Sequence, residues 1–307
     1  MKSVRLHTYK YLLTQQISHR FYISSHLSKK TSMQTSLWAV ILGGSSGMGL
    51  ATAKKLASEG YHIFIAHRDR KAAMTTINAE FDQIRQHSIQ FAAINADALS
   101  EDGQQQIMAA LQTALGNEGK VKLLFHSIAL GNLKPLAIPP NLSEADIDNT
   151  PLYQKEPLSH EDFNQTIYAM ATSLVTWSQL LLNGQHFANR SRILGMTSEG
   201  GTRAWLGYAA VGAAKAALES IVRAMAVELA PHQITTNVLN AGVTDTPALR
   251  LIPGSDQMKS TAIQRNPFHR LTTPEDVANV VYLLCRPEAD WINGSIIRVD
   301  GGEQIVG

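Results

Sequence analysis

The chain of 307 residues has a single cysteine, Cys285. One thiol excludes an intramolecular disulfide and cannot build a cysteine zinc site, and we predict no metal centre. The sequence also lacks a run of about 18 apolar residues, the length that a helix needs to span a bilayer. These absences indicate a protein of a reducing, aqueous compartment that has no membrane span.

Acidic residues are missing from the start of the chain, where the first is Glu59. Residues 1–36 hold six of the 27 Lys and Arg and none of the 25 acids, so the remainder has a net charge of −4 and offers no electrostatic case for nucleic acid binding. We interpret this basic extension as an organelle transit peptide or a disordered segment, ahead of a true start at Met33. The expected location is the cytoplasm, or a mitochondrial or plastid matrix if the segment is a transit peptide.

From Leu37 onward, short apolar runs alternate with helical stretches. The runs are LWAVILGG, YHIFIAH, IQFAAINAD, KLLFHSIAL, SRILGMTS, ITTNVLNAG and SIIRVDGG. Runs of this kind are typical of parallel strands that are buried on both faces. The alternation predicts an α/β fold, a Rossmann-like doubly wound parallel sheet, as a single domain over residues 37–307.

One segment, Pro135–Asp162, breaks the alternation. It contains five of the 11 prolines and six acids. Because it is too long for an ordinary connection, we interpret it as an insertion. It is either a loop over the site or an insertion on the surface, and we favour the second.

A glycine cluster, Gly43-Gly44-Ser45-Ser46-Gly47-Met48-Gly49, follows the first predicted strand and opens a helix. Glycines let the backbone turn sharply and approach a pyrophosphate, whose charge is stabilised at a helix N-terminus. In this strand–turn–helix context, the cluster predicts a dinucleotide site.

The second predicted strand ends in His67-Arg68-Asp69-Arg70-Lys71. Arg68, with Arg70 or Lys71, suits a 2′-phosphate, which favours NADPH. NADH is the alternative if Asp69 reaches the ribose. Asp97, at the end of the third strand, is placed either to meet the adenine or to cap the next helix.

Tyr208 and Lys215 are seven residues apart in a segment rich in Ala and Leu, for which we predict a helix over residues 208–226. Seven steps of about 100° return to within about 20° of the start, so the phenol and the ammonium face one cleft at different depths. Ser198 precedes Tyr208 by ten residues. A deep acid and a cofactor anchor on one helix indicate an oxidoreductase.

Together these segments resemble the short-chain dehydrogenase/reductase family from about Leu37 to the C-terminus. The resemblance includes the run from Asn237 through Gly242, Val243 and Thr246, and the ending INGSIIRVDGG. It implies that Gly242, Val243 and Thr246 lie near the nicotinamide.

Most family members carry Tyr-x-x-x-Lys, but that tyrosine position is Val211 here. The Tyr-x6-Lys spacing and the run His126-Ser127-Ile128 are similar to the enoyl-acyl carrier protein reductase branch. The segment that begins at Tyr208, YAAVGAAKAALES…AVELAPHQITTNV, and the later run GVTDTPALR are similar to the NADPH-dependent bacterial members of this branch. This resemblance implies catalytic roles for Tyr208, Lys215 and Ser198, and cofactor contacts for Ser127 and Ile128.

The implied reaction is NADPH-dependent reduction of the trans-2 double bond of an enoyl thioester in fatty acid synthesis. Tyr208 would donate a hydrogen bond to the enolate oxygen, while Lys215 would bind the nicotinamide ribose and make the phenol more acidic. The alternatives are a 3-oxoacyl or other carbonyl reductase and a non-catalytic cofactor-binding module. His126, on an apolar strand, is expected to be a core residue rather than a base.

The segment 247–254 is predicted to be a mobile lid over an acyl slot lined by Leu249, Leu251 and Ile252, or else a packed loop. Arg203 and Arg250 are candidates for contacts with an acidic acyl carrier protein. The resemblance also implies a homotetramer, assembled through the helix with the Tyr–Lys pair and its neighbour.

Overall fold

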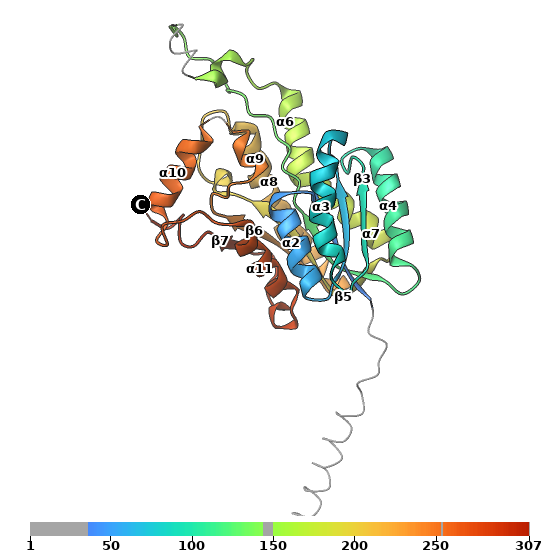
Figure 1. The fold of residues 1–307 in the computed structure, drawn as a ribbon. Helices are drawn as coiled ribbons and strands as arrows, with labels where there is room; N and C mark the ends of the chain where they lie inside the picture. The colour runs from blue at the N-terminus through green and yellow to red at the C-terminus, as the bar shows by residue number, and fades with distance from the viewer. Residues whose placement is uncertain (1–35, 144–149, 253, 307) are drawn as a thin grey trace, which may run out of the picture. The chain divides into compact units, whose positions relative to one another are not determined.

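The computed structural model describes residues 36–143, 150–252 and 254–306. The predicted basic extension, up to residue 35, lies outside the described residues, as do residues 144–149 of the predicted insertion. Within residues 36–306, the described chain forms a seven-stranded parallel sheet in the order β3-β2-β1-β4-β5-β6-β7 (Figure 1). The strands are β1 (Leu37–Leu42), β2 (His62–His67), β3 (Phe91–Asn95), β4 (Lys120–His126), β5 (Phe187–Thr197), β6 (Ile234–Ala241) and β7 (Ile296–Val299).

Helices cover both faces of the sheet. The α-helices are α2 (Gly47–Ser58), α3 (Met74–Arg85), α4 (Glu101–Leu115), α6 (His160–Ile167), α7 (Ser173–Asn183), α8 (Ala209–Glu228), α9 (Pro247–Arg250), α10 (Ser255–Arg265) and α11 (Pro274–Cys285). Short helices are η1 (Lys71–Ala73), η2 (Pro151–Gln154), η4 (Glu199–Gly201), η5 (Ala230–His232) and η6 (Pro287–Ala289), and a π-helical turn, η3 (Tyr168–Thr172), joins α6 to α7.

Alternate residues of each strand enter two separate cores, because side chains of a strand point to opposite faces. In β1, Ala39 and Ile41 pack under α2, α3 and α11, whereas Trp38, Val40 and Leu42 pack under α4, α7 and α8. Burial on both faces explains the continuous apolar runs. The predicted doubly wound parallel sheet is therefore confirmed.

The strand order reverses between β1 and β4, and ligands of such sheets bind in the crevice beyond the carboxyl ends at this point. Leu42 is in register with His126, and the Ser127 amide donates to the Leu42 carbonyl at 2.9 Å. The glycine turn after β1 and the run after β4 therefore meet at one edge.

The described part of the segment between β4 and α6 extends beyond the top of α6 (Figure 1). Its described residues include one short helix, η2, from which buried Leu152 packs against Gly207, next to Tyr208. The insertion is thus anchored beside the Tyr208 loop, and its role stays a prediction.

Candidate active site

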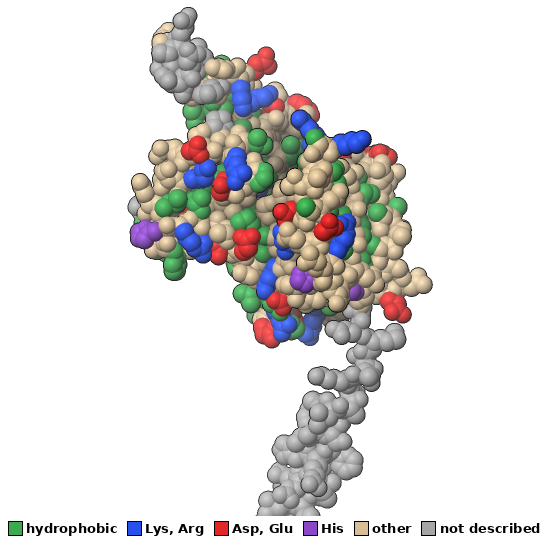
Figure 2. All heavy atoms as spheres, in the orientation of Figure 1, with side chains coloured by type: hydrophobic (Ala, Val, Ile, Leu, Met, Phe, Trp, Pro, Cys, Tyr) green, Lys and Arg blue, Asp and Glu red, His purple; other side chains and the backbone are tan. Residues whose placement is uncertain are grey.

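Two adjoining clefts lie at the carboxyl edge of the sheet, each of about 280 Å³, and share Met48, Ser127, Ile128 and Thr246 in their walls. A hollow between the surfaces over α2 and over α9–α10 is visible in Figure 2. The first, nucleotide-side cleft is lined by the predicted residues Gly43, Ser45, Ser46, Gly47, Met48, Arg68, Asp97, Ser127, Ile128 and Thr246. The second, substrate-side cleft is lined by Ser198, Tyr208, Lys215, Gly242 and Val243, again with Thr246.

The glycine turn forms a cradle with exposed backbone amides. Gly43 has φ of +83°, and a Cβ there would lie 2.7 Å from the Ser127 carbonyl oxygen. Helix α2 begins without a side-chain cap and without an acid in its first turn. Its first N–H groups are therefore available to an anion, as a pyrophosphate requires.

Gly49 is not placed as the cofactor contact that the sequence predicts, because it lines neither cleft. A Cβ at Gly49 would lie 2.2 Å from the Gly43 carbonyl oxygen. Its lack of a side chain lets α2 pack against the turn, so its role is to support the cradle.

At the adenosine end, two predicted cofactor residues bond to each other: Arg68 Nη1 donates to Asp97 Oδ2 at 2.8 Å. The alternative that Asp97 caps the next helix is wrong, because Ser100 accepts the capping bond of α4 from Gly103. The Asp69 carboxylate already lies 2.9 Å from His67 Nδ1. Arg68 is thus the cation at the mouth of the nucleotide-side cleft.

Tyr208 is the N-cap residue of α8, with φ of −106°, so the predicted helix start at Tyr208 is wrong by one residue. Its carbonyl accepts from Gly212 at 2.7 Å and starts the helical ladder. Burial raises the pKa of Tyr208, the Glu199 charge adds to the increase, and Ser198 opposes it. The phenol therefore stays protonated at neutral pH.

Lys215 is not among the groups that shift the pKa of Tyr208, so the expected acidification by its charge is not seen, and burial raises this pKa. Buried Lys215 instead donates from Nζ to the Met196 carbonyl at 2.8 Å. Burial lowers the pKa of Lys215 to about 8, and Glu219 partly offsets this effect. The ammonium faces β5 rather than the phenol.

His126 is a buried core residue, which confirms the expectation. Its Nε2 lies 2.8 Å from Ser173 Oγ, which itself donates to the Ala169 carbonyl. Because the hydroxyl proton is used there, His126 Nε2 is the donor. Burial and the Lys215 charge lower the pKa of His126 to about 3, so the ring is neutral.

A buried hydroxyl without a partner faces the same cleft. Ser198 Oγ makes no hydrogen bond of ordinary geometry among the described residues. Val211 packs against Met170 and has no proton to give. An orphaned buried donor beside a protonated phenol suits an oxygen of a bound substrate.

The other walls of the substrate-side cleft are mainly apolar. Leu249, Leu251 and Ile252 line it from the predicted lid segment. Trp205 and Met258 also line it, as do Glu199, Glu303 and Gln304. These five residues could not be predicted from the sequence, because no motif or spacing marks them and they meet only in the folded chain.

Arg203 and Arg250 both have partners within the chain. Arg203 lies 3.4 Å from Glu199, and Arg250 donates two bonds to Asp245 at 2.9 and 3.0 Å. On the face in Figure 2, basic and acidic side chains are interspersed. These pairs leave less charge for an acidic carrier protein than the sequence suggested.

In residues 36–306, apart from the undescribed gaps, no group of three His, Cys, Asp or Glu is placed to hold a metal ion. Among the helices of the same residues, none has the length and apolar character needed to cross a bilayer.

Similarities to a family model and to known proteins identify the family of this chain. A family model described as "Enoyl-(Acyl carrier protein) reductase" matches residues 43–304. The chain is 27% identical over 264 residues to the 7alpha-hydroxysteroid dehydrogenase of Escherichia coli strain K12, covering 86% of this chain and 92% of the relative. It is 25% identical over 263 residues to the 3-oxoacyl-[acyl-carrier-protein] reductase MabA of Mycobacterium tuberculosis strain H37Rv, covering 86% and 91%.

Among solved structures, the fold is similar to the enoyl-[acyl-carrier-protein] reductase (NADH) from Aquifex aeolicus VF5. The TM-score is 0.73 at 23% identity, over 90% of this chain and 99% of that one. The family match spans the glycine turn, strands β2 to β7 and the Tyr208–Lys215 helix. The chain therefore belongs to the short-chain dehydrogenase/reductase family of oxidoreductases.

Proposed function

We propose that this oxidoreductase reduces the trans-2 double bond of an enoyl thioester in fatty acid synthesis, with NADPH as reductant. The placement of the phenol carries the proposal. Tyr208 reaches the cleft from the turn before α8, whereas Val211, where most family members have their tyrosine, is apolar and packed on Met170. A ketone needs a proton on its oxygen, but an enoyl thioester needs only a hydrogen bond there.

The nicotinamide cofactor, when bound, supplies the hydride. The uncapped start of α2 and the glycine cradle suit its pyrophosphate. Arg68, with 57% of its side chain exposed, would exchange its ion pair with Asp97 for a 2′-phosphate, which favours NADPH over NADH. Lys215 is the candidate for the nicotinamide ribose hydroxyls.

Two hydroxyl groups of the chain would stabilise the charge that moves to the thioester oxygen when the β-carbon is reduced. The Tyr208 phenol is protonated near pH 7, because burial raises its pKa, and can donate a hydrogen bond to this oxygen. The Ser198 hydroxyl is the second donor. One such oxyanion donor is worth about 3–4 kcal/mol. The α-carbon then takes up a proton from Tyr208 or from water, which neutralises the enolate.

The apolar wall from α9–α10 suits an acyl chain. Leu249, Ile252 and Met258 line the cleft on this side. Apolar pockets hold acyl groups through burial, at about 0.8 kcal/mol for each CH₂ group. An acyl thioester, on a carrier protein or on coenzyme A, therefore matches both the polar and the apolar halves of the cleft.

The second candidate is a carbonyl reductase. It is favoured by the similarity to MabA and to the hydroxysteroid dehydrogenase. In this reading Tyr208 would have to give its proton to an alkoxide from a position three residues before the tyrosine of most family members, and regain a proton from water.

The test is NADPH oxidation by the wild-type chain with crotonyl, 2-octenoyl and acetoacetyl thioesters, followed by mass analysis of the products. Saturated acyl thioesters from the first two support the proposal. Turnover of acetoacetyl thioester alone would establish the carbonyl reductase instead.

A further inference from the structure

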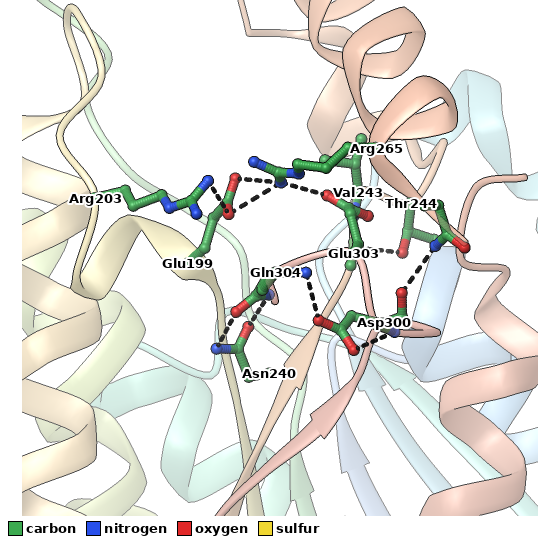
Figure 3. Close-up of polar contacts among 12 residues, drawn as sticks. Glu199, Arg203, Asn240, Val243, Thr244, Arg265, Asp300, Glu303 and Gln304 are labelled. Carbon is green, nitrogen blue, oxygen red and sulfur yellow. Dashed lines mark hydrogen bonds and ion pairs between the residues drawn. The ribbon is translucent and has the colours of Figure 1, made fainter. Parts of the chain in front are cut away.

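The Arg265 guanidinium joins three segments that surround the substrate-side cleft (Figure 3). Its Nη2 lies 3.2 and 3.1 Å from the two carboxylate oxygens of Glu199, and 2.9 Å from Oε1 of Glu303. Arg265 ends α10, Glu199 directly follows Ser198, and Glu303 follows β7. These three residues, Glu199, Arg265 and Glu303, are called the latch below.

The latch is shielded from water. Glu303 exposes 1% of its surface and Glu199 9%, and the Arg265 side chain exposes 15%. Solvent and salt therefore screen its attractions little. Loss of the cation alone would leave the buried Glu303 carboxylate without a cation among the described residues and Glu199 with its longer contact to Arg203, which is strongly unfavourable.

Each carboxylate of the latch also acts on a group near the reaction. Glu303 Oε2 accepts from the Val243 amide at 3.0 Å, and a Cβ at Gly242 would lie only 2.6 Å from that oxygen. Glu303 thereby holds the loop that follows β6. Glu199, on the other side, precedes the Tyr208 loop and its charge raises the pKa of Tyr208.

We infer that Arg265 is a positioning residue, which couples the apolar wall on α9–α10 to the loop that carries Ser198 and Tyr208. Arg265 lines neither cleft described above but holds two residues that do, Glu199 and Glu303. The latch keeps the acyl chain aligned with the hydrogen-bond donors. The inference goes beyond the proposed function, because the same alignment is needed for an enoyl or a 3-oxoacyl thioester.

All three contacts come from one nitrogen atom, and Arg265 Nε is buried without a hydrogen-bond partner among the described residues. The fork geometry of a guanidinium is therefore not used here. A lysine ammonium, with three donors, can replace a single nitrogen of this kind. We expect Arg265→Lys to keep most of the function that Arg265→Met loses.

The experiment measures kcat and KM for the cofactor and for whichever thioester the wild type reduces, in Glu199→Ala, Arg265→Met and Arg265→Lys. Glu199→Ala breaks the latch while leaving a balanced buried pair, Arg265 with Glu303. The matched control is Arg270→Met, which removes two bonds to Asp276, at 2.6 and 3.0 Å, outside the cleft lining.

Glu199→Ala and Arg265→Met should lose about tenfold or more in kcat/KM for the thioester, since small displacements of a reacting group are costly. The KM for the cofactor should change less than about twofold, and Arg265→Lys should stay within about threefold of wild type. Arg270→Met should match the wild type.

Wild-type kcat/KM in Glu199→Ala overturns the inference, whether or not Arg265→Met folds. Equal losses for thioester and cofactor, or a lysine variant no better than the methionine variant, also overturn it. If the wild type reduces only acetoacetyl thioester, the proposed function fails and the latch is judged on that substrate.

Discussion

At the scale of single residues, burial decides what each polar group can do. It raises the pKa of the Tyr208 phenol, which keeps the proton on a hydrogen-bond donor. It lowers the pKa of Lys215 to about 8 and that of His126 to about 3. The phenol and the imidazole are therefore neutral near pH 7, and Lys215 is the cation among the three.

The depressed pKa of Lys215 predicts how stability depends on pH. An unfolded lysine has an ordinary pKa of 10.5, so between about 8 and 10.5 the unfolded state binds more protons than the folded state. The free energy of unfolding therefore rises with pH across this range, because the cost of burying the ammonium is complete below about 8 and is gone above about 10.5. Urea unfolding of the free protein should show that the difference in free energy of unfolding, wild type minus Lys215→Met, rises across this window. A pH-independent difference would contradict the assignment.

Arg68 predicts a cofactor preference. Arg68→Ala should weaken the binding of NADPH by about tenfold or more, because a hydrogen bond to a charged group is worth about 1.5–3 kcal/mol. The binding of NADH should be nearly unchanged. The neighbouring Arg70→Ala, at an exposed position outside the cleft lining, is the control. The KM values for both cofactors test this prediction. An equal loss of affinity for NADPH and NADH in Arg68→Ala would show that Arg68 does not contact the 2′-phosphate.

At the scale of elements, close packing at the glycine turn explains why α2 begins where it does. Gly49→Ala places a Cβ against the Gly43 carbonyl, whereas Gly195→Ala in β5 meets only ordinary contacts at 3.4 Å. We expect Gly49→Ala to lose about 1–3 kcal/mol of stability, and cofactor affinity with it. Thermal melting with and without NADPH tests this, and a Gly49→Ala variant no worse than Gly195→Ala would contradict it.

The strands and most helices could be predicted, because burial on two faces produces continuous apolar runs and the helical segments are rich in helix formers. The start of α8 was missed by one residue, since composition alone does not separate an N-cap from a first helical turn. The π-helical turn at Tyr168–Thr172 depends on a local shift of hydrogen bonds that no residue pattern announces.

The parts of the candidate site that belong to a sequence motif could be predicted. The contacts between residues far apart in the sequence could not be predicted. The glycine turn and the pair of Tyr208 and Lys215 are local spacings. The latch joins residues 66 and 38 positions apart, from Glu199 to Arg265 and from Arg265 to Glu303. Such contacts exist only once α10 and the C-terminal turns pack beside β5 and β6.

At the scale of the whole molecule, we propose the homotetramer expected of the family, assembled through α8 and its neighbour. Small exposed residues, Ala216, Ser220 and Ala224, recur at four-residue spacing on α8, which lets another helix approach closely. Light scattering should give about four times the chain mass of 33.5 kDa, and Ser220→Arg should lower it. A monomer in the wild type would contradict the assembly.

The most direct test of the central claim is kcat/KM for 2-octenoyl and acetoacetyl thioesters in the wild type and in Tyr208→Phe. We expect reduction of the enoyl thioester by the wild type, and a loss of about a hundredfold or more in the variant, because the oxyanion loses a preorganised donor. Reduction of acetoacetyl thioester alone, or an unimpaired Tyr208→Phe, would contradict it.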